Sequence, residues 1–204
     1  TDFLSSQKKQ LFFSSTNFEE TKLGSGWAWD DAYYYYQAER SPLPIHGNII
    51  IVNKPKSSAN FNVKPRLFSN SFVLNEKVKG SSLNRKPSSN IFEYNKSVLE
   101  NSYSNDHPFF YTDELALELI YQEKGIRIES SNLRQDAVEN LKTIYSVPTD
   151  TLYQKLMQES DNFIAEQLLL VASDQQLGKL RIGMREIQNL TSMQKQEHFA
   201  ITTA

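Results

Sequence analysis

The stretch PTDTLYQKLMQESDNFIAEQLLLVA, residues 148–172, decides the fold class of this chain. Pro148 is suited to the start of a helix, and one apolar helix face is indicated by the spacing of Leu152, Leu156 and Met157. Ser160-Asp161-Asn162 interrupts this pattern, and a second helix is predicted over about residues 163–172. Two helices separated by three short polar residues predict a rigid turn that presents polar side chains.

A further helix is predicted upstream of this stretch. Thr112 is a suitable N-cap, and Gly125 is well placed as the residue after the helix ends. The apolar positions expected on one face are Leu115, Leu119, Ile120 and Tyr121. A short strand over 126–128 should follow, and residues 177–190 again show helical spacing of apolar side chains.

The sequence before Pro108 has the character of a β region. The β-branched run 49–52 predicts a buried strand, and short apolar runs at 66–68, 71–74 and 90–94 are separated by polar turn residues. Such a pattern is typical of small antiparallel sheets. Residues 1–25 are polar and serine-rich with short aromatic runs, which could form an edge strand or an irregular connection. We therefore expect an α+β fold, with a β-rich region over 1–107 and a helical region over 108–204.

Composition excludes several classes of function. The 204 residues include 22 basic and 24 acidic side chains, a net charge of −2, which does not indicate a nucleic-acid surface. The longest apolar runs are too short to cross a bilayer, and no export leader begins the chain. Without cysteine there are no disulfides or thiolate sites, and three scattered histidines do not suggest zinc. We expect neither a metal nor a cofactor.

Three segments resemble one family in the order expected for it. Gly26-Trp27-Ala28-Trp29-Asp30-Asp31, followed by Tyr36, resembles a Gly-Trp-x-Trp-x-Asp segment of the low-molecular-mass class C penicillin-binding proteins, the D-alanyl-D-alanine carboxypeptidase/endopeptidase family. Residues 111–128 are similar to its helix-glycine-strand unit, and 145–170 to its helix, Ser-Asp-Asn loop and next helix. The resemblance implies part of a penicillin-binding transpeptidase-like helical core with a β-rich inserted region.

The resemblance also implies a chemistry for bacterial cell wall. In this family the serine of a Ser-x-x-Lys motif attacks the D-Ala-D-Ala bond, a Ser-x-Asn motif relays protons, and a Lys-Thr-Gly strand binds the terminal carboxylate. By resemblance Ser160 and Asn162 are catalytic, whereas Asp31 and Tyr36 bind the diamino acid of the peptidoglycan stem peptide. The protein would then be periplasmic or otherwise exported, and would react with β-lactams if the full active site is present.

Each of these residues also has a structural interpretation. Ser160 or Asn162 could cap the following helix, Asp31 could form an Asx turn, and the run Tyr33–Tyr36 could be an aromatic strand in a core. Glu166 is expected to be a solvated or ion-paired helix residue. The Ser-x-Asn triplet alone carries no weight, because it recurs at Ser15, Ser58, Ser82, Ser88 and Ser130.

Two family motifs are missing. Ser-x-x-Lys occurs at Ser5, Ser6 and Ser192, none of which has the expected context, and no Lys-Thr-Gly occurs. The chain is therefore expected to be a D-Ala-D-Ala peptidase fragment that is inactive by itself, or a non-catalytic homologue that binds stem peptide or a protein partner. A third interpretation is a β-rich glycan-binding module that uses Trp27, Trp29 and the tyrosine run.

Overall fold

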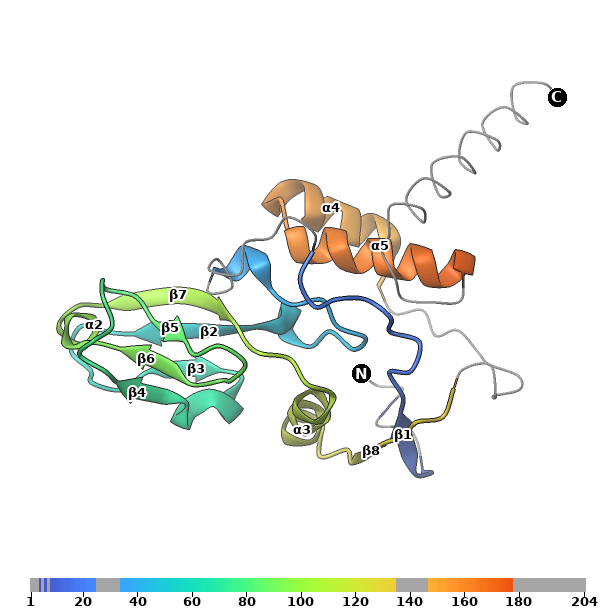
Figure 1. Ribbon diagram of the computed structural model, residues 1–204, viewed down its shortest axis with the longest axis horizontal. Coiled ribbons are helices and arrows are strands. Elements are labelled where there is room, and N and C mark those ends of the chain that lie inside the picture. Colours follow the sequence, from blue (N-terminus) through green and yellow to red (C-terminus); the bar gives the residue numbers. More distant parts are fainter. Residues whose placement is uncertain (1–3, 5, 7, 25–33, 135–146, 178–204) are drawn as a thin grey trace, which may run out of the picture. The chain divides into compact units, whose positions relative to one another are not determined.

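The computed structural model of the chain describes residues 4, 6, 8–24, 34–134 and 147–177 (Figure 1). The chain forms two compact units. The first comprises Thr1–Phe13 and Lys22–Ser131, and the second comprises Ser14–Thr21 and Asn132–Ala204. The division into 1–107 and 108–204 stays a prediction. Trp27, Trp29, Asp31 and the helical spacing beyond residue 177 lie outside the described residues.

The centre of the first unit is a three-stranded antiparallel sheet in the order β3-β2-β7. β2 (Ile49–Lys54) lies between β3 (Asn62–Lys64) and β7 (Tyr103–Pro108). The strand predicted over 49–52 is confirmed, and it buries Ile50 and Val52 completely while Ile51 faces outward. β7 was not predicted, because its sequence YSNDHP has almost no apolar residues.

A second small sheet has the order β4-β6-β5. β4 (Phe72–Leu74) and β6 (Phe92–Tyr94) confirm the strands predicted near 71–74 and 90–94, and β5 (Asn84–Arg85) completes the sheet. The expectation of purely antiparallel pairing is wrong, because β4 and β6 run parallel.

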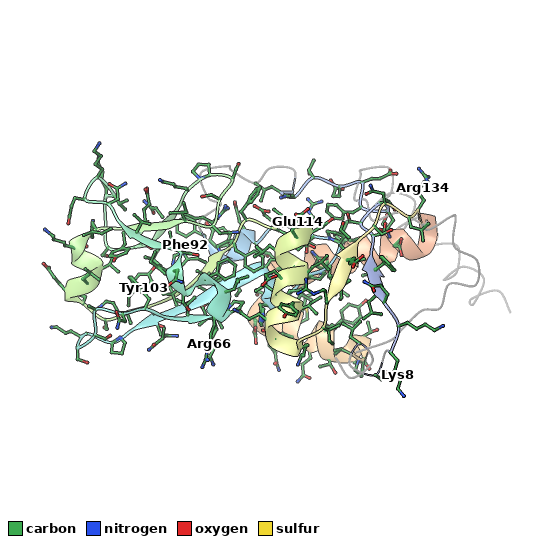
Figure 2. The ribbon with its side chains drawn as sticks, turned by 90° about the horizontal axis from the view of Figure 1, so that it is seen from below. Lys8, Arg66, Phe92, Tyr103, Glu114 and Arg134 are labelled. Carbon is green, nitrogen blue, oxygen red and sulfur yellow. The ribbon has the colours of Figure 1, made fainter. Side chains whose placement is uncertain are left out.

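The run 66–68 forms a 3-10 helix, η4 (Arg66–Asn70), in place of a strand. Pro65 precedes it with a φ of −66°, and the Ser69 hydroxyl donates to the Arg66 carbonyl at 2.7 Å, which closes the turn. Phe68 is thereby buried, and it stacks on Phe109 with 5.3 Å between ring centroids. Phe92 and Tyr103 lie inside this β region, whereas Arg66 points outward (Figure 2).

The helix predicted after Thr112 is confirmed as α3 (Asp113–Lys124). The Thr112 hydroxyl accepts a hydrogen bond from the Leu115 N–H at 3.1 Å, and Gly125 ends the helix with a φ of +66°. The buried face is Ala116, Leu117 and Leu119, so the predicted position of Tyr121 on the buried face is wrong; its side chain is exposed.

The strand predicted over 126–128 begins at the last of those residues. It is β8 (Ile128–Ser130), which pairs in parallel with β1 (Leu11–Phe13). β1 confirms the edge strand that was one of the two alternatives for residues 1–25. A short helix, α2 (Lys96–Glu100), was not predicted; Asn95 caps it by accepting from the Ser97 N–H at 3.0 Å.

The second unit contains α4 (Thr149–Glu159) and α5 (Asn162–Leu177), which confirms the two helices predicted around Ser160-Asp161-Asn162. Leu152 and Leu156 are half-buried, whereas the inward placement of Met157 is wrong because it is 79% exposed. Helices and sheets together confirm the α+β prediction. In the part of the chain that the structure describes, no helix has both the length and the apolar character needed to cross a bilayer.

Candidate functional site

The Ser160-Asp161-Asn162 turn is built by two helix ends that meet. Ser160 is the C-cap of α4 and adopts a left-handed conformation with φ 50° and ψ 45°, while its backbone N–H donates to the Leu156 carbonyl. Asp161 then caps α5, because its Oδ1 accepts the Ile164 N–H at 2.9 Å. Only two residues, Ser160 and Asp161, therefore separate the two helices.

This arrangement leaves the two outer side chains of the triplet exposed. Capping of α5 is performed by Asp161, so neither Ser160 nor Asn162 is needed for it. A serine with φ near +50° is a strained choice where glycine is the usual residue. Ser88 has the same conformation, so the strain by itself assigns no role, but an exposed hydroxyl and amide on such a turn can hydrogen-bond a peptide substrate.

A second group of exposed side chains comes from the tyrosine run of the first unit. η2 (Tyr35–Gln37) replaces the aromatic strand that was the alternative interpretation, and that alternative is wrong for the described tyrosines. Tyr34, Tyr35 and Tyr36 are 53%, 59% and 37% exposed. Tyr34 and Tyr36 stack with ring centroids 5.4 Å apart, and Tyr35 meets Tyr36 edge-on at 5.8 Å. These rings form an aromatic surface rather than core.

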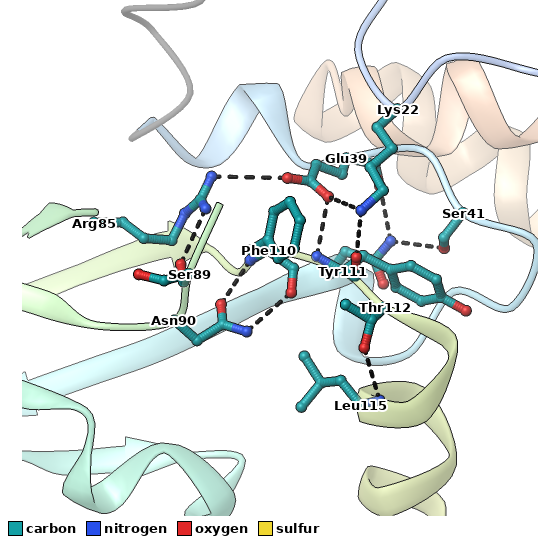
Figure 3. A network of polar contacts seen from close by, with 11 residues as sticks. Lys22, Glu39, Ser41, Arg85, Ser89, Asn90, Phe110, Tyr111, Thr112 and Leu115 are labelled. Carbon is teal, nitrogen blue, oxygen red and sulfur yellow. Dashed lines mark hydrogen bonds and ion pairs between the residues drawn. The ribbon is translucent and has the colours of Figure 1, made fainter. Parts of the chain in front are cut away.

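A buried polar network holds the residues that follow this surface (Figure 3). The Glu39 carboxylate, almost completely buried, accepts the Tyr111 N–H at 3.0 Å and lies 3.5 Å from the Lys22 ammonium and 3.8 Å from the Arg85 guanidinium. The Lys22 ammonium also donates to the Tyr111 carbonyl and lies 3.9 Å from the centre of the Phe110 ring. Two cations and a backbone N–H thus compensate the buried charge.

Asn48 extends the network to the chain that leaves η2. Its amide nitrogen donates to the Glu39 carbonyl at 2.8 Å and to the Ser41 hydroxyl at 2.7 Å, and its Oδ1 accepts the Ile45 N–H. Buried hydrogen bonds therefore anchor the segment from Gln37 to Ser41 to Asn48, just before β2, and to Tyr111, just before α3. The exposed rings of Tyr34, Tyr35 and Tyr36, which we call the tyrosine surface, directly precede this anchored segment.

Tyr111 is not a candidate base. Burial, followed by the negative charge of Asp113, raises the pKa of Tyr111 well above the ordinary 10.0. The phenol stays protonated at any physiological pH. Burial likewise raises the pKa of the Asp106 carboxyl on β7. Neither group belongs to the residues that the sequence indicated, and both shifts reflect desolvation inside the fold.

The sequence-predicted site residues fall in both units. Tyr36 is in the first unit, whereas Ser160 and Asn162 are in the second. Asp31, Ser5 and Ser192 lie outside the described residues. The union of these residues in a single cleft stays a prediction. Sequence reasoning missed the network around Glu39, since nothing in the local pattern distinguishes a buried carboxylate from a solvated one. Among the described residues no group of three acidic or histidine side chains could hold a metal ion.

Comparison with known proteins adds a family to this geometry. The model of the D-Ala-D-Ala carboxypeptidase 3 (S13) family matches residues 6–180. No curated protein matches the chain. Among solved structures, penicillin binding protein 4 from Haemophilus influenzae is similar with a TM-score of 0.63 and 14% identity, over 88% of this chain and 45% of that protein. The chain thus spans less than half the length of that structure.

The structural match shows a shared fold, and the family match covers most of the chain, including α4, α5 and the turn between them. Both agree with the resemblance to low-molecular-mass class C penicillin-binding proteins that the three sequence segments indicated. That resemblance is confirmed: the chain belongs to the D-Ala-D-Ala carboxypeptidase 3 (S13) family.

Proposed function

We propose that the chain is part of a serine-type D-Ala-D-Ala peptidase of peptidoglycan metabolism, exported to the compartment where the wall is built. One observation carries the assignment beyond family membership. At the turn between α4 and α5, Asp161 does the capping, and a strained Ser160 and an exposed Asn162 are left for the substrate.

The residues of the turn have separate roles in this proposal. A serine nucleophile, contributed outside the described residues, attacks the carbonyl of the D-Ala-D-Ala bond and forms an ester as the C–N bond breaks. The Ser160 hydroxyl passes the nucleophile's proton to the leaving D-Ala amine. The Asn162 amide hydrogen-bonds the backbone of the substrate and holds the scissile bond in place.

The acidic-aromatic pair, Asp31 and Tyr36, would bind the side chain of the substrate's diamino acid. Asp31 binds the free ammonium of the stem-peptide diamino acid, and Tyr36 packs against its methylene groups. The exposure of Tyr36, on a surface anchored by the Glu39 network, supports this role. In the protein encoded by the complete reading frame, Asp31→Asn should lower the rate of hydrolysis at least tenfold for peptides that carry the free amine. Acylation by penicillin, which lacks that side chain, should change little.

The decisive experiment measures acylation of that complete protein by a fluorescent penicillin. Ser160→Ala and Asn162→Ala should each lower the acylation rate about 100-fold or more, as is usual when a proton-transfer group or a transition-state donor is removed. Asp161→Asn is the matched control, because asparagine also caps helices and acylation should persist. Unchanged acylation in the Ser160→Ala and Asn162→Ala variants would contradict the roles proposed for them.

A non-catalytic homologue that binds stem peptide is the second candidate, because the absence of Lys-Thr-Gly from the sequence fits it as well as it fits a fragment of an active enzyme. Here the complete protein would bind amine-bearing stem peptide without hydrolysing it or reacting with penicillin. A glycan-binding module that uses the exposed tyrosines is distinguished by Asp31→Asn. That change should weaken binding of stem peptide but leave the binding of plain glycan strands unaltered.

A further inference from the structure

Charge is divided unevenly along this chain. Residues 54–103, which form most of the β region, contain nine basic and three acidic side chains, a net charge of +6. The remaining residues contain thirteen basic and twenty-one acidic side chains, a net charge of −8. The small net charge of the whole chain conceals this separation. A segregated basic region indicates an anionic binding partner.

Three segments come together at one end of the β region and form what we call the basic tip: residues 55–58, 75–80 and 96–100. A buried lysine joins two of them. Lys54 is 1% exposed, and its ammonium donates to the carbonyls of Pro55, Ser58 and Leu99 at 3.3, 3.1 and 2.9 Å. The turn after β2 is thereby held against the end of α2.

The third segment is held by the residues that begin α2. The Asn95 amide nitrogen donates to the carbonyls of Val78 and Gly80 at 2.8 and 2.7 Å, and the Ser97 hydroxyl donates to the Gly80 carbonyl at 3.3 Å. Since a buried ammonium and an amide cross-link all three segments, the basic tip is a preorganised surface and not a set of independent loops.

The outer face of the basic tip carries lysines. Lys56, Lys77 and Lys79 are exposed and make no ion pair with any other described residue, whereas Lys96 pairs with Glu76 at 3.6 Å. The basic tip thus carries four exposed lysines and only two exposed glutamates, Glu76 and Glu100. Lysine suits a partner whose anionic groups are irregularly placed, because its ammonium is a point charge on a flexible stem.

The basic tip is remote from the tyrosine surface's anchoring network in the first unit. β7 begins at Tyr103, shortly after α2, and ends at Pro108. Tyr111, which belongs to the Glu39 network, follows three residues later, just before α3. A six-residue strand spans about 20 Å. Figure 1 shows α2 at one end of the β region and α3 at the other. A ligand on the basic tip would therefore leave Tyr36 accessible.

We infer that the basic tip binds the carboxylates of peptidoglycan, as a second contact with the polymer whose peptides the proposed function cleaves. This inference rests on that function. Chemistry favours a polyanion over a bilayer, because none of the exposed large apolar side chains lies within the three segments, and membrane-inserting surfaces need such side chains. Several weak contacts to a repeating polymer raise the local concentration of substrate at the active site.

The test is co-sedimentation of the protein with purified peptidoglycan sacculi at low salt. A variant with Lys56→Gln, Lys77→Gln and Lys79→Gln should bind at least tenfold more weakly, since each lysine near an anionic surface contributes about a factor of five. The matched control changes three exposed lysines elsewhere in the first unit, Lys8, Lys9 and Lys124, to glutamine. It should bind as the unaltered protein does.

Two further probes identify the ligand. The protein should no longer co-sediment with sacculi whose carboxyl groups are converted to amides. It should also not co-sediment with vesicles of phosphatidylcholine and phosphatidylglycerol. The inference is wrong if the triple variant and the control bind sacculi equally, if amidated sacculi bind normally, or if vesicles alone bind. Penicillin acylation of the complete protein is a separate readout, so failure of this inference and failure of the proposed function are distinguishable.

Discussion

Two serines among the described residues occupy a backbone conformation that suits glycine. Ser160 has a φ of +50° at the turn between α4 and α5, and Ser88 has a φ of +52° in the loop before β6. A side chain with a Cβ atom is disfavoured in the left-handed region by about 1 kcal/mol. The same strain is therefore present at one proposed functional position and at one position without a proposed function.

Replacing each serine with glycine separates stability from function. Ser160→Gly and Ser88→Gly should each raise the free energy of unfolding by about 0.5–1 kcal/mol in urea titrations. Only Ser160→Gly should also lower penicillin acylation of the complete protein, because it removes the hydroxyl. Equal acylation of the two variants would contradict the proton-transfer role proposed for Ser160.

Asp106 is a residue whose charge opposes folding. Burial raises the pKa of its carboxyl above the ordinary 3.8, so the folded state binds the proton more tightly than the unfolded state. The penalty is present above the raised pKa and disappears as the pH falls through it to below 3.8. Asp106→Asn should therefore be more stable than the unaltered protein at pH 7, with a difference that vanishes near pH 3.

Urea unfolding of both proteins at pH 7, 5 and 3 checks this prediction. Glu118→Gln, an exposed change on α3, is the control and should stay within about 0.5 kcal/mol at every pH. A difference between Asp106→Asn and the unaltered protein that grows as the pH falls would have the wrong sign. It would mean that the charged carboxylate has a favourable partner in the fold.

Single residues were predictable where their partners are close in sequence. Thr112 bonds a residue three positions away, and Gly125 ends a helix by its own backbone conformation. Buried charges were not predictable. Lys54 meets a carbonyl 45 residues away, and Glu39 meets an N–H 72 residues away. Only the folded chain brings such groups together, and by sequence each resembles a solvated surface residue.

At the scale of elements, periodicity located the helices because an apolar face recurs every three to four residues. It failed for β7, whose edge position in the sheet lets Ser104 and Asn105 stay exposed and removes the alternating signal. The parallel pairing of β4 with β6 was equally hidden, because β5 lies between them in sequence and pairs antiparallel with β6. Short strands leave pairing direction to tertiary contacts.

The Glu39 network joins elements, and its removal should loosen the first unit. Glu39→Gln keeps an acceptor for the Tyr111 N–H but leaves the buried Arg85 guanidinium without its carboxylate. Breaking a buried pair from one side costs about 3–5 kcal/mol, and the remaining amide should reduce this to about 2–4 kcal/mol. Lys22, which is partly exposed, can turn to water.

Thermal and urea unfolding of the Glu39→Gln protein measure that loss. The matched control is Glu76→Gln, which removes the exposed pair with Lys96 in the same unit and should cost about 0.5 kcal/mol or less. If the two variants unfold alike, Glu39 is compensated by solvent and the segment after the tyrosine surface lacks the buried anchor described above.

At the scale of the whole molecule, the family could be read from three short segments, whereas the active site could not be completed from them. The two helices α4 and α5 and the turn between them followed from local patterns. The predicted union of Tyr36 with that turn in a single cleft depends on the arrangement of two compact units, which no periodicity encodes. The basic tip was hidden for a similar reason, since a net charge of −2 averages over both signs.

The 204-residue chain by itself should therefore fold without catalysing its family's reaction. It contains no Lys-Thr-Gly, and no Ser-x-x-Lys with the expected context, so carboxylate binding and nucleophilic attack both lack their residues. We expect no hydrolysis of D-Ala-D-Ala peptides and no labelling by fluorescent penicillin, with the complete reading frame as the positive control. Labelling of the isolated chain that disappears in Ser5→Ala or Ser192→Ala would contradict this and would place the nucleophile within these residues.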